Sequence, residues 1–129
     1  MGMPAAKQGD QVMATDTHII LMPPYSTPTP LPHPFAGMLS GGLSSDVMIG
    51  GMPAAILSST ADNLPPHIPQ GGPFQKPPAN KGQIIMGSST VLINGQPAAR
   101  NGDTATTCND PADLPAGTVM ATGTVMIGG

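Results

Sequence analysis

One short repeat, split between the two ends of the chain, constrains what this sequence can fold into. Residues 47–55 read VMIGGMPAA and residues 91–99 read VLINGQPAA. The first half of this pattern returns at residues 125–129 as VMIGG, and the second half occurs at residues 3–6 as MPAA. Laid end to end, the two termini complete a third copy. A repeat divided in this way predicts a closed ring of three units, because an open stack would need capping repeats at its ends.

Each copy has the local chemistry of a β-hairpin. Residues 90–93 (TVLI) are apolar and rich in β-branched side chains, and Asn94-Gly95 is a dipeptide typical of tight hairpin turns. The chain has no Glu, only 4 Lys and Arg together, and 17 Pro and 17 Gly in 129 residues, which disfavours helices. We therefore predict an all-β fold: a small cone or pyramid of short hairpins with internal pseudo-three-fold symmetry, closed by the terminal segments and without significant helix.

Proline-rich stretches separate the copies. Residues 23–34 contain six prolines, and residues 65–78 contain six more. We expect both stretches to form rigid, largely polyproline-like loops that rise from the β scaffold. The chain is predicted to be a single domain over residues 1–129, with repeats around 3–18, 47–68 and 91–110 and a C-terminal half-repeat at 124–129 that completes the first.

Charge and hydropathy exclude several functions. With 4 basic residues and a net charge of -3, nucleic acid is not an expected partner, because phosphate backbones require clustered Lys and Arg. No apolar run reaches the ~20 residues of a membrane-spanning helix. The N-terminus lacks the apolar stretch of a signal peptide, so we expect assembly in the cytoplasm.

The fold needs support beyond its core. Tyr25, Phe35 and Phe74 are the only aromatic residues, and a small core of this kind leaves little stability over chain entropy. Cys108 is the only cysteine, so an internal disulfide is excluded. A bound metal or a protein partner could supply the missing stability.

The three histidines and the cysteine are the candidate metal ligands. His18 and His67 each lie fourteen residues after the Pro of their own Pro-Ala-Ala, and Cys108 lies eleven residues after that of the last copy. His33 lies in the first proline-rich stretch. Three imidazoles and one thiolate suit a closed structural zinc site, and iron is less favoured because of the thiolate. Taken singly, a histidine in such a loop is more often a solvated residue, and a lone cysteine a small buried hydrophobe.

Residues 87–103 read GSSTVLINGQPAARNGD. This stretch resembles the repeat of PAAR (proline-alanine-alanine-arginine) domain proteins. The residues that carry the motif in the three copies are Pro4, Ala5, Ala6, Pro53, Ala54, Ala55, Pro97, Ala98, Ala99, Arg100, Gly102 and Asp103. Two departures stand out: Ile56 follows the middle Pro-Ala-Ala with no Gly-Asp after it, and Lys7 replaces the Arg in the first copy.

The resemblance implies a conical β domain on the end of a trimeric β-helical spike. That spike would be the VgrG-type protein of a type VI secretion system, or its counterpart in a phage tail or related contractile injection system. The domain would cap and sharpen the spike for membrane puncture and could take part in effector delivery. On its own the domain would be monomeric, and one copy would bind each spike trimer as its tip. It would contact the target membrane only transiently and would leave the cell as part of the device. The resemblance also implies one zinc ion near the vertex, held by His18, His33, His67 and Cys108.

Spike docking is expected at the hairpin end of the domain, with the metal at the other end. The candidate spike-binding residues are Met48, Leu92 and Met126. Two other functions stay open as alternatives: a metal-free Pro/Gly-rich adhesive or linker module, and a small zinc hydrolase. Because a cysteine ligand would close the zinc site and the chain has no Glu to act as a base, we expect no enzymatic activity.

Overall fold

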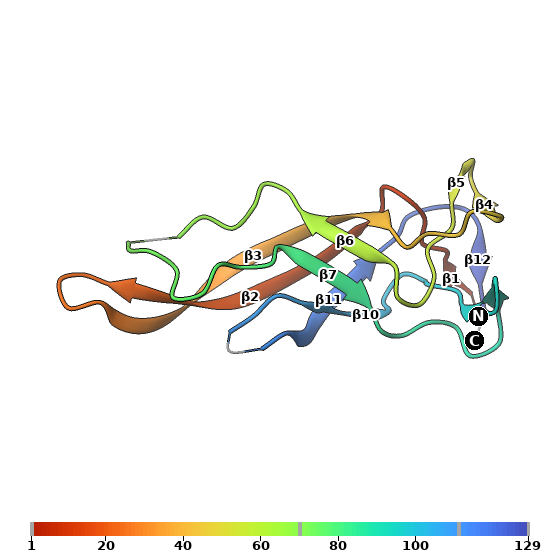
Figure 1. Cartoon of the computed structure of the whole chain (residues 1–129). Coiled ribbons are helices and arrows are strands. Elements are labelled where there is room, and N and C mark those ends of the chain that lie inside the picture. The colour runs from red at the N-terminus through yellow and green to blue at the C-terminus, as the bar shows by residue number, and fades with distance from the viewer. Residues whose placement is uncertain (1, 70, 111, 129) are drawn as a thin grey trace.

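A computed structural model describes residues 2–69, 71–110 and 112–128 of the chain, and only strands, turns and loops occur in these ranges. The molecule is elongated, with both termini at one end and a long hairpin reaching towards the other (Figure 1). The predicted all-β fold without helix is therefore confirmed over the described part. In that part, no helix is long and apolar enough to cross a membrane. Gly129, the last residue of the predicted half-repeat, lies outside the described residues.

Three two-stranded sheets form a ring at the end that carries the termini. Two of them are local, and the third joins the first strand of the chain to the last, as the split repeat predicted. The pairs are β4 (Met48–Ile49) with β5 (Met52–Pro53), β8 (Leu92–Ile93) with β9 (Gln96–Pro97), and β1 (Met3–Pro4) with β12 (Met126–Ile127). Asn94 and Gly95 have φ values of 53° and 78°, so the β8–β9 turn uses the left-handed conformations that the dipeptide predicted.

The three Pro-Ala-Ala segments meet in a closed cycle of backbone hydrogen bonds. Ala6 N–H donates to the Ala99 carbonyl at 3.0 Å, Ala99 N–H to Ala55 at 3.1 Å, and Ala55 N–H to Ala6 at 3.0 Å. All three alanines are fully buried. A small side chain is needed at this position because three backbones approach one another here.

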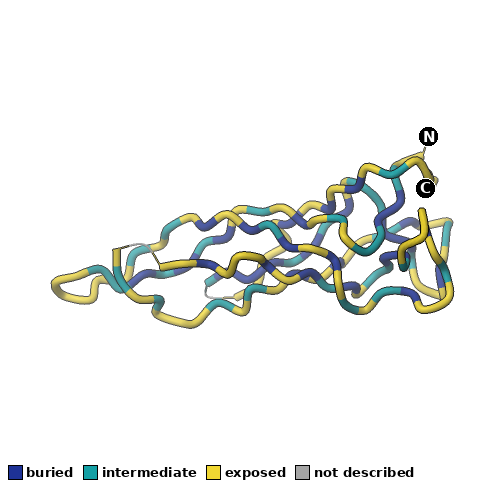
Figure 2. Tube along the Cα trace, turned by 90° about the horizontal axis from the view of Figure 1, so that it is seen from above, coloured by how far each residue is buried: buried dark blue, intermediate teal, exposed yellow. Residues whose placement is uncertain are grey.

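Above the ring, six antiparallel strands close into a barrel. Their order is β10 (Thr104–Thr107), β11 (Leu114–Met120), β2 (Gln11–Met22), β3 (Thr27–Gly41), β6 (Thr60–Asn63) and β7 (Lys81–Ile84). Buried and more exposed residues alternate along the strands (Figure 2), as expected when one face of each strand points into the barrel. Phe35 is 1% exposed, and a Cβ on Gly37 would lie 2.7 Å from its ring, so this one aromatic side chain fills the barrel between its neighbours.

The prediction for residues 23–34 was wrong for most of that stretch, because residues 27–34 belong to β3 and pair with β2. Pro28, Pro30 and Pro32 lie opposite Leu21, Ile19 and Thr17 of β2. Those β2 residues donate their N–H groups elsewhere, to Pro73, Asp110 and Asn109. The prolines thus occupy positions that need no N–H in the β2–β3 ladder, on an edge that β6 does not reach.

The second proline-rich stretch is a loop, as expected. Within the described residues of 65–78, regular pairing is limited to an isolated bridge between Phe74 and Ile20, flanked by two backbone hydrogen bonds of 2.9 Å, from Leu21 N–H to the Pro73 carbonyl and from Gln75 N–H to the Ile19 carbonyl. A closed barrel with a buried core also differs from the flexible adhesive or linker segment considered above.

Candidate metal centre

Two strands and two loops bring five metal-capable side chains together at the far end of the barrel, beyond Phe35. Asp16 and His18 lie on β2 and His33 on β3, while His67 follows β6 and Cys108 follows β10. Side chains on a strand alternate between its two faces, so Asp16 and His18 share the inward face. Each of the five is at most 9% exposed.

Four of these side chains form a tight cluster that could hold a metal ion. The ligand atoms of Asp16, His18, His67 and Cys108 all lie within 4.8 Å of one another. His67 Nε2 is 2.8 Å from Asp16 Oδ2, and Cys108 Sγ is 3.4 Å from the same oxygen and 3.6 Å from His18 Nε2. Three of the four predicted ligands are thus in the cluster, together with a carboxylate that the sequence analysis did not single out.

His33, the fourth predicted ligand, lies beside this cluster with an unused nitrogen. Its ring is 5.5 Å from that of His18 and 5.6 Å from that of His67. The Leu31 carbonyl lies 3.0 Å from His33 Nδ1, which places the proton on Nδ1 and a lone pair on Nε2. This Nε2 is buried without a hydrogen-bond partner. A buried imidazole nitrogen that has no hydrogen-bond partner and lies next to the cluster is available to coordinate a metal ion.

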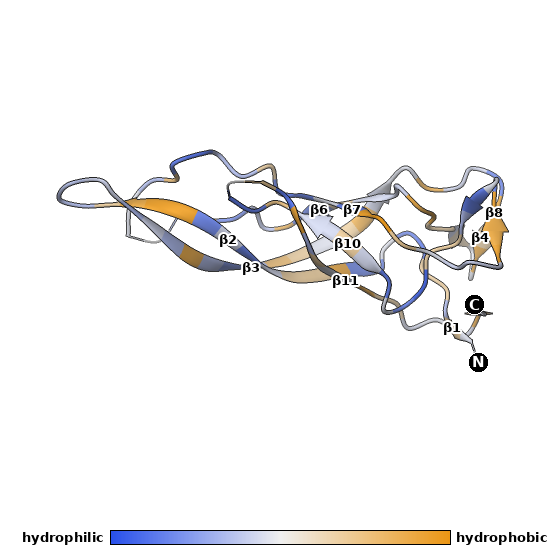
Figure 3. Cartoon of the chain, turned by 90° about the horizontal axis from the view of Figure 1, so that it is seen from below, coloured by the Kyte–Doolittle hydropathy of each residue, from blue (hydrophilic) through white to orange (hydrophobic). Residues whose placement is uncertain are grey.

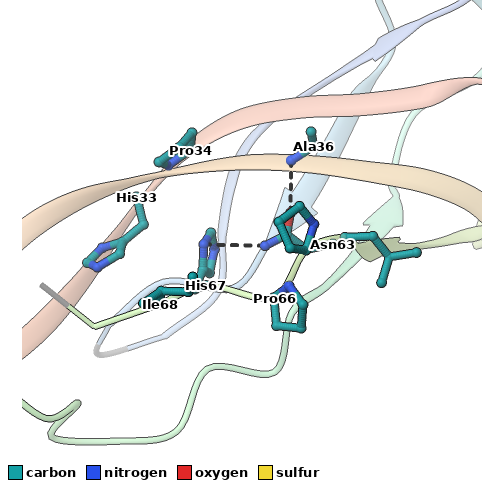
Figure 4. A pocket seen from close by; sticks show the side chains of 9 residues that line it. His33, Pro34, Ala36, Asn63, Pro66, His67 and Ile68 are labelled. Atoms are coloured by element: carbon teal, nitrogen blue, oxygen red, sulfur yellow. Dashed lines mark hydrogen bonds between the residues drawn. The ribbon is translucent and has the colours of Figure 1, made fainter.

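A pocket of about 290 Å³ opens against two of these histidines. His33 and His67 form its inner wall, and Pro34, Pro66 and Ile68 surround them (Figure 4). Asn63, also on the wall, donates from Nδ2 towards His67 Nδ1 at 3.3 Å. The pocket therefore connects the cluster to the outside of the barrel.

Burial sets the protonation state of the cluster. Desolvation, reinforced by the neighbouring His67, lowers the pKa of His18, which keeps this imidazole neutral and able to bind a cation. Desolvation, with a further contribution from the Asp16 charge, raises the pKa of Cys108 to about 11. The thiol is therefore protonated at neutral pH, and a metal ion must displace its proton to bind the thiolate.

Asp16 has a clear sequence signal in retrospect, since it precedes His18 by two positions on the same strand face. Its Oδ1 accepts hydrogen bonds from Thr107 Oγ1 at 2.5 Å and from Asn109 Nδ2 at 3.4 Å. These contacts fix the carboxylate and direct Oδ2 at His67 and Cys108. The signal was missed because the candidate set was restricted to His and Cys.

The motif residues after the alanines close a turn in each third of the ring. Arg100 donates to Asp103 from its backbone N–H at 2.7 Å and from Nη2 at 2.9 Å. Lys7 and Asp10 repeat the arrangement in the first copy, with backbone and side-chain contacts at 3.0 and 3.2 Å. The hydrogen bonds that its guanidinium donates to the Asp103 carboxylate raise the pKa of Arg100.

The middle copy closes the same turn without charge. Ile56 N–H donates to Ser59 Oγ at 2.9 Å, so a hydroxyl oxygen takes the place of the aspartate acceptor at this turn. Ser58 has φ 78°, close to the 91° and 90° of Gly9 and Gly102 at the corresponding positions. The backbone symmetry thus survives the departure from the motif.

The three candidate docking residues occupy equivalent places on the three two-stranded sheets of the ring. Met48, Leu92 and Met126 are 55%, 60% and 57% exposed, whereas the isoleucine after each is buried at 6–7%. β8, which carries Leu92, is coloured strongly hydrophobic in Figure 3. The end of the molecule that carries the termini therefore presents apolar side chains with three-fold spacing.

Comparison with protein-family models identifies the family to which this chain belongs. The model of the PAAR motif matches residues 32–110 and again residues 74–129, which together cover most of the chain. A comparison with curated proteins finds no matching relative. The family is structural and is associated with the spike tips of type VI-like secretion systems and with VgrG spike partners. With its three-fold ring and split repeat, the chain belongs to the PAAR motif family.

Proposed function

We propose that this chain caps and sharpens a trimeric VgrG-type spike of a type VI or phage-tail-like injection system. The observation that carries the proposal is the closed cycle through Ala6, Ala55 and Ala99. A single chain with this internal pseudo-symmetry can present the same surface to each of three identical subunits, without a symmetry conflict.

The docking surface is the base triad, which we define as Met48, Leu92 and Met126. Exposed apolar side chains gathered at one end of a protein are typical of a binding site, and the triad repeats once in each third of the ring. The β2–β3 hairpin points away from this end (Figure 1) and would lead during membrane puncture.

One zinc ion, held by His18, His33, His67 and Cys108, completes the tip. The buried Nε2 of His33 and the neutral imidazole of His18 suit this role. A closed His and Cys site supplies structural cross-linking, which can contribute on the order of 10 kcal/mol to folding. The chain's own residues supply the ligands from two strands and two loops, so the ion would tie the distal half of the barrel together.

This role is structural and fits assembly in the cytoplasm, followed by delivery outside the cell or into a target cell as part of the device. Contact with the target membrane would be transient, and any effector cargo would travel with the tip.

Docking is tested by sedimentation of the chain with a VgrG-type spike trimer from the same organism. The wild-type chain is expected to co-sediment at one copy per trimer, and the variant Met48→Asp/Leu92→Asp/Met126→Asp to sediment alone. Met13→Asp is the control, because Met13 is 43% exposed on the barrel wall, away from the ring. Retained binding by the triple variant would refute docking through the base triad.

The metal is tested by elemental mass spectrometry on untagged, chelator-washed protein. About one zinc per chain is the expected result. A cooperatively unfolding protein that contains no metal would remove the zinc site from the proposal and leave docking to be decided by sedimentation.

A further inference from the structure

Asp16 is a fifth donor in a site that needs four. Its side chain is completely buried, and its Oδ2 lies 2.8 Å from His67 Nε2 and 3.4 Å from Cys108 Sγ. Its other oxygen is held by Thr107 and Asn109. The carboxylate therefore cannot turn away from the cluster without losing these hydrogen bonds.

Metal binding removes the hydrogen bonds that Oδ2 accepts. A zinc ion displaces the proton of the Cys108 thiol and takes the lone pair of an imidazole nitrogen on His67. If that nitrogen is Nε2, neither side chain can still donate to Asp16 Oδ2. A buried carboxylate oxygen without a donor is costly, and the nearest group that can compensate it is the cation itself.

Charge balance also favours an acidic side chain beside the metal. A zinc ion with three neutral imidazoles and one thiolate leaves a net charge of about +1 in a buried site, which is unfavourable unless a counter-charge is near. The Asp16 carboxylate supplies that charge at contact distance from two ligands. Asp110, a second acidic side chain near the site, is also buried, with 4% of its side chain exposed; its Oδ2 accepts the Ile19 N–H at 2.9 Å and lies 3.7 Å from His18 Nδ1. It thus approaches the His18 nitrogen opposite the one that faces Cys108, whereas Asp16 lies among the ligand atoms themselves.

We propose that Asp16 is a reserve metal ligand. It stands beside the ion when Cys108 is bound, and it takes the fourth position when the thiolate is lost, so that the ion stays in place. The proposal rests on the metal site of the proposed function. It extends that site by giving the chain a way to keep its metal after the only cysteine has been lost as a ligand.

The test is a double-mutant cycle with cobalt as the probe. Cobalt affinity is measured by chelator competition for the wild type, Cys108→Ala, Asp16→Asn and the double variant, and absorption spectra report thiolate and tetrahedral bands. Cys108→Ala/Asp62→Asn is the matched control, because the Asp62 side chain is 52% exposed on the barrel wall. Zinc content by elemental analysis repeats the comparison with the expected ion.

Cys108→Ala is expected to keep about one metal per chain, to lose the thiolate band, to retain the visible cobalt bands, and to bind on the order of 10–100-fold more weakly. Adding Asp16→Asn should weaken binding at least about tenfold more in this background than in the wild type. The Asp62→Asn control should cause no further loss. Equal effects of Asp16→Asn in both backgrounds would overturn the proposal.

Two further outcomes separate this proposal from the one on which it rests. Absence of metal, or of a thiolate band, in the wild-type chain would refute the zinc site itself. A wild type that binds normally, beside Cys108→Ala and Cys108→Ser variants that both lose the metal or cannot be recovered folded, would refute the reserve ligand alone.

Discussion

The ion pair in the turn after the third Pro-Ala-Ala can be tested quantitatively, because the middle copy forms the same turn without an ion pair and so serves as a natural control. Asp103 is 4% exposed and accepts three hydrogen bonds from Arg100: from the backbone N–H at 2.7 Å, from Nε at 3.3 Å and from Nη2 at 2.9 Å. In the middle copy, Ser59 accepts only the backbone N–H of Ile56. Substitutions at Asp103 can therefore separate the backbone bond from the ion pair.

Asp103→Ala removes all three hydrogen bonds and leaves a guanidinium whose side chain is only 16% exposed without its partner. Hydrogen bonds to charged groups contribute about 1.5–3 kcal/mol, so we expect the free energy of unfolding to fall by about 2–3 kcal/mol. Asp103→Ser keeps an acceptor for the backbone N–H, as Ser59 does, and should cost about 1–2 kcal/mol. Adding Arg100→Ile to Asp103→Ser copies the middle turn and should recover part of this loss, because no unpaired charge remains.

The assay is urea unfolding followed by far-ultraviolet circular dichroism, since the chain contains no Trp. Free metal must be the same in every sample, because bound metal adds to the apparent stability. The expected order of stability is wild type, then Arg100→Ile/Asp103→Ser, then Asp103→Ser, then Asp103→Ala. Equal stability of the Ser and Ala variants would show that the backbone bond contributes nothing, and a double variant weaker than Asp103→Ser would refute the ion-pair reasoning.

Three other perturbations follow from the structure. Phe35→Ala should lower the free energy of unfolding by about 3–5 kcal/mol in urea titrations, and a loss below about 1 kcal/mol would contradict its place at the centre of the barrel. Gly95→Ala, at φ 78°, should cost about 1 kcal/mol in the same assay, whereas Gly128→Ala, with open space around its Cβ, should be close to neutral. Folding raises the pKa of the Cys108 thiol from 9.0 to about 11, so the unfolded chain releases this proton at a lower pH than the folded one. The free energy of unfolding of the metal-free protein should therefore fall between about pH 9 and 11, by up to about 1.4 kcal/mol per pH unit. Cys108→Ala should abolish this slope.

The ring could be predicted from sequence because its information is local and repeated. Asn94-Gly95 specifies its own turn, and the division of the repeat between residues 3–6 and 125–129 specifies which strands pair. Both features can be identified without knowledge of any long-range contact.

The barrel strands were harder to predict, because proline content dominates the local signal. Residues 27–34 look like a polyproline segment, yet each proline from Pro28 to Pro34 occupies a position whose N–H is not needed. The alternation itself was the clue: Thr29, Leu31 and His33 between the prolines have the period of two of a strand with an inward face. The position of Asp16 on the same strand face as His18 could also be read from this alternation, whereas its contact with Thr107, which is far away in sequence, could not.

The position of the candidate metal centre follows from the unequal lengths of the strands in the three pseudo-symmetric thirds of the chain. Each third of the chain contributes one pair of strands to the barrel, β2–β3, β6–β7 and β10–β11, but the first pair is much longer than the other two. Pairing stops at Asp62 with Lys81 in the second and at Thr107 with Leu114 in the third. Beyond these points the β2–β3 hairpin has no complete barrel around it.

His67 and Cys108 lie just past those two strand ends, and His18 and His33 lie on the long hairpin at the same level. The cluster therefore begins where the backbone ladder of the barrel ends. Coordination by one ion would join all three thirds of the chain at that level and so replace the missing strand pairing. The four proposed ligands would then come in unequal numbers, two from the long hairpin and one from each short one, because only the long hairpin continues on both sides of the site.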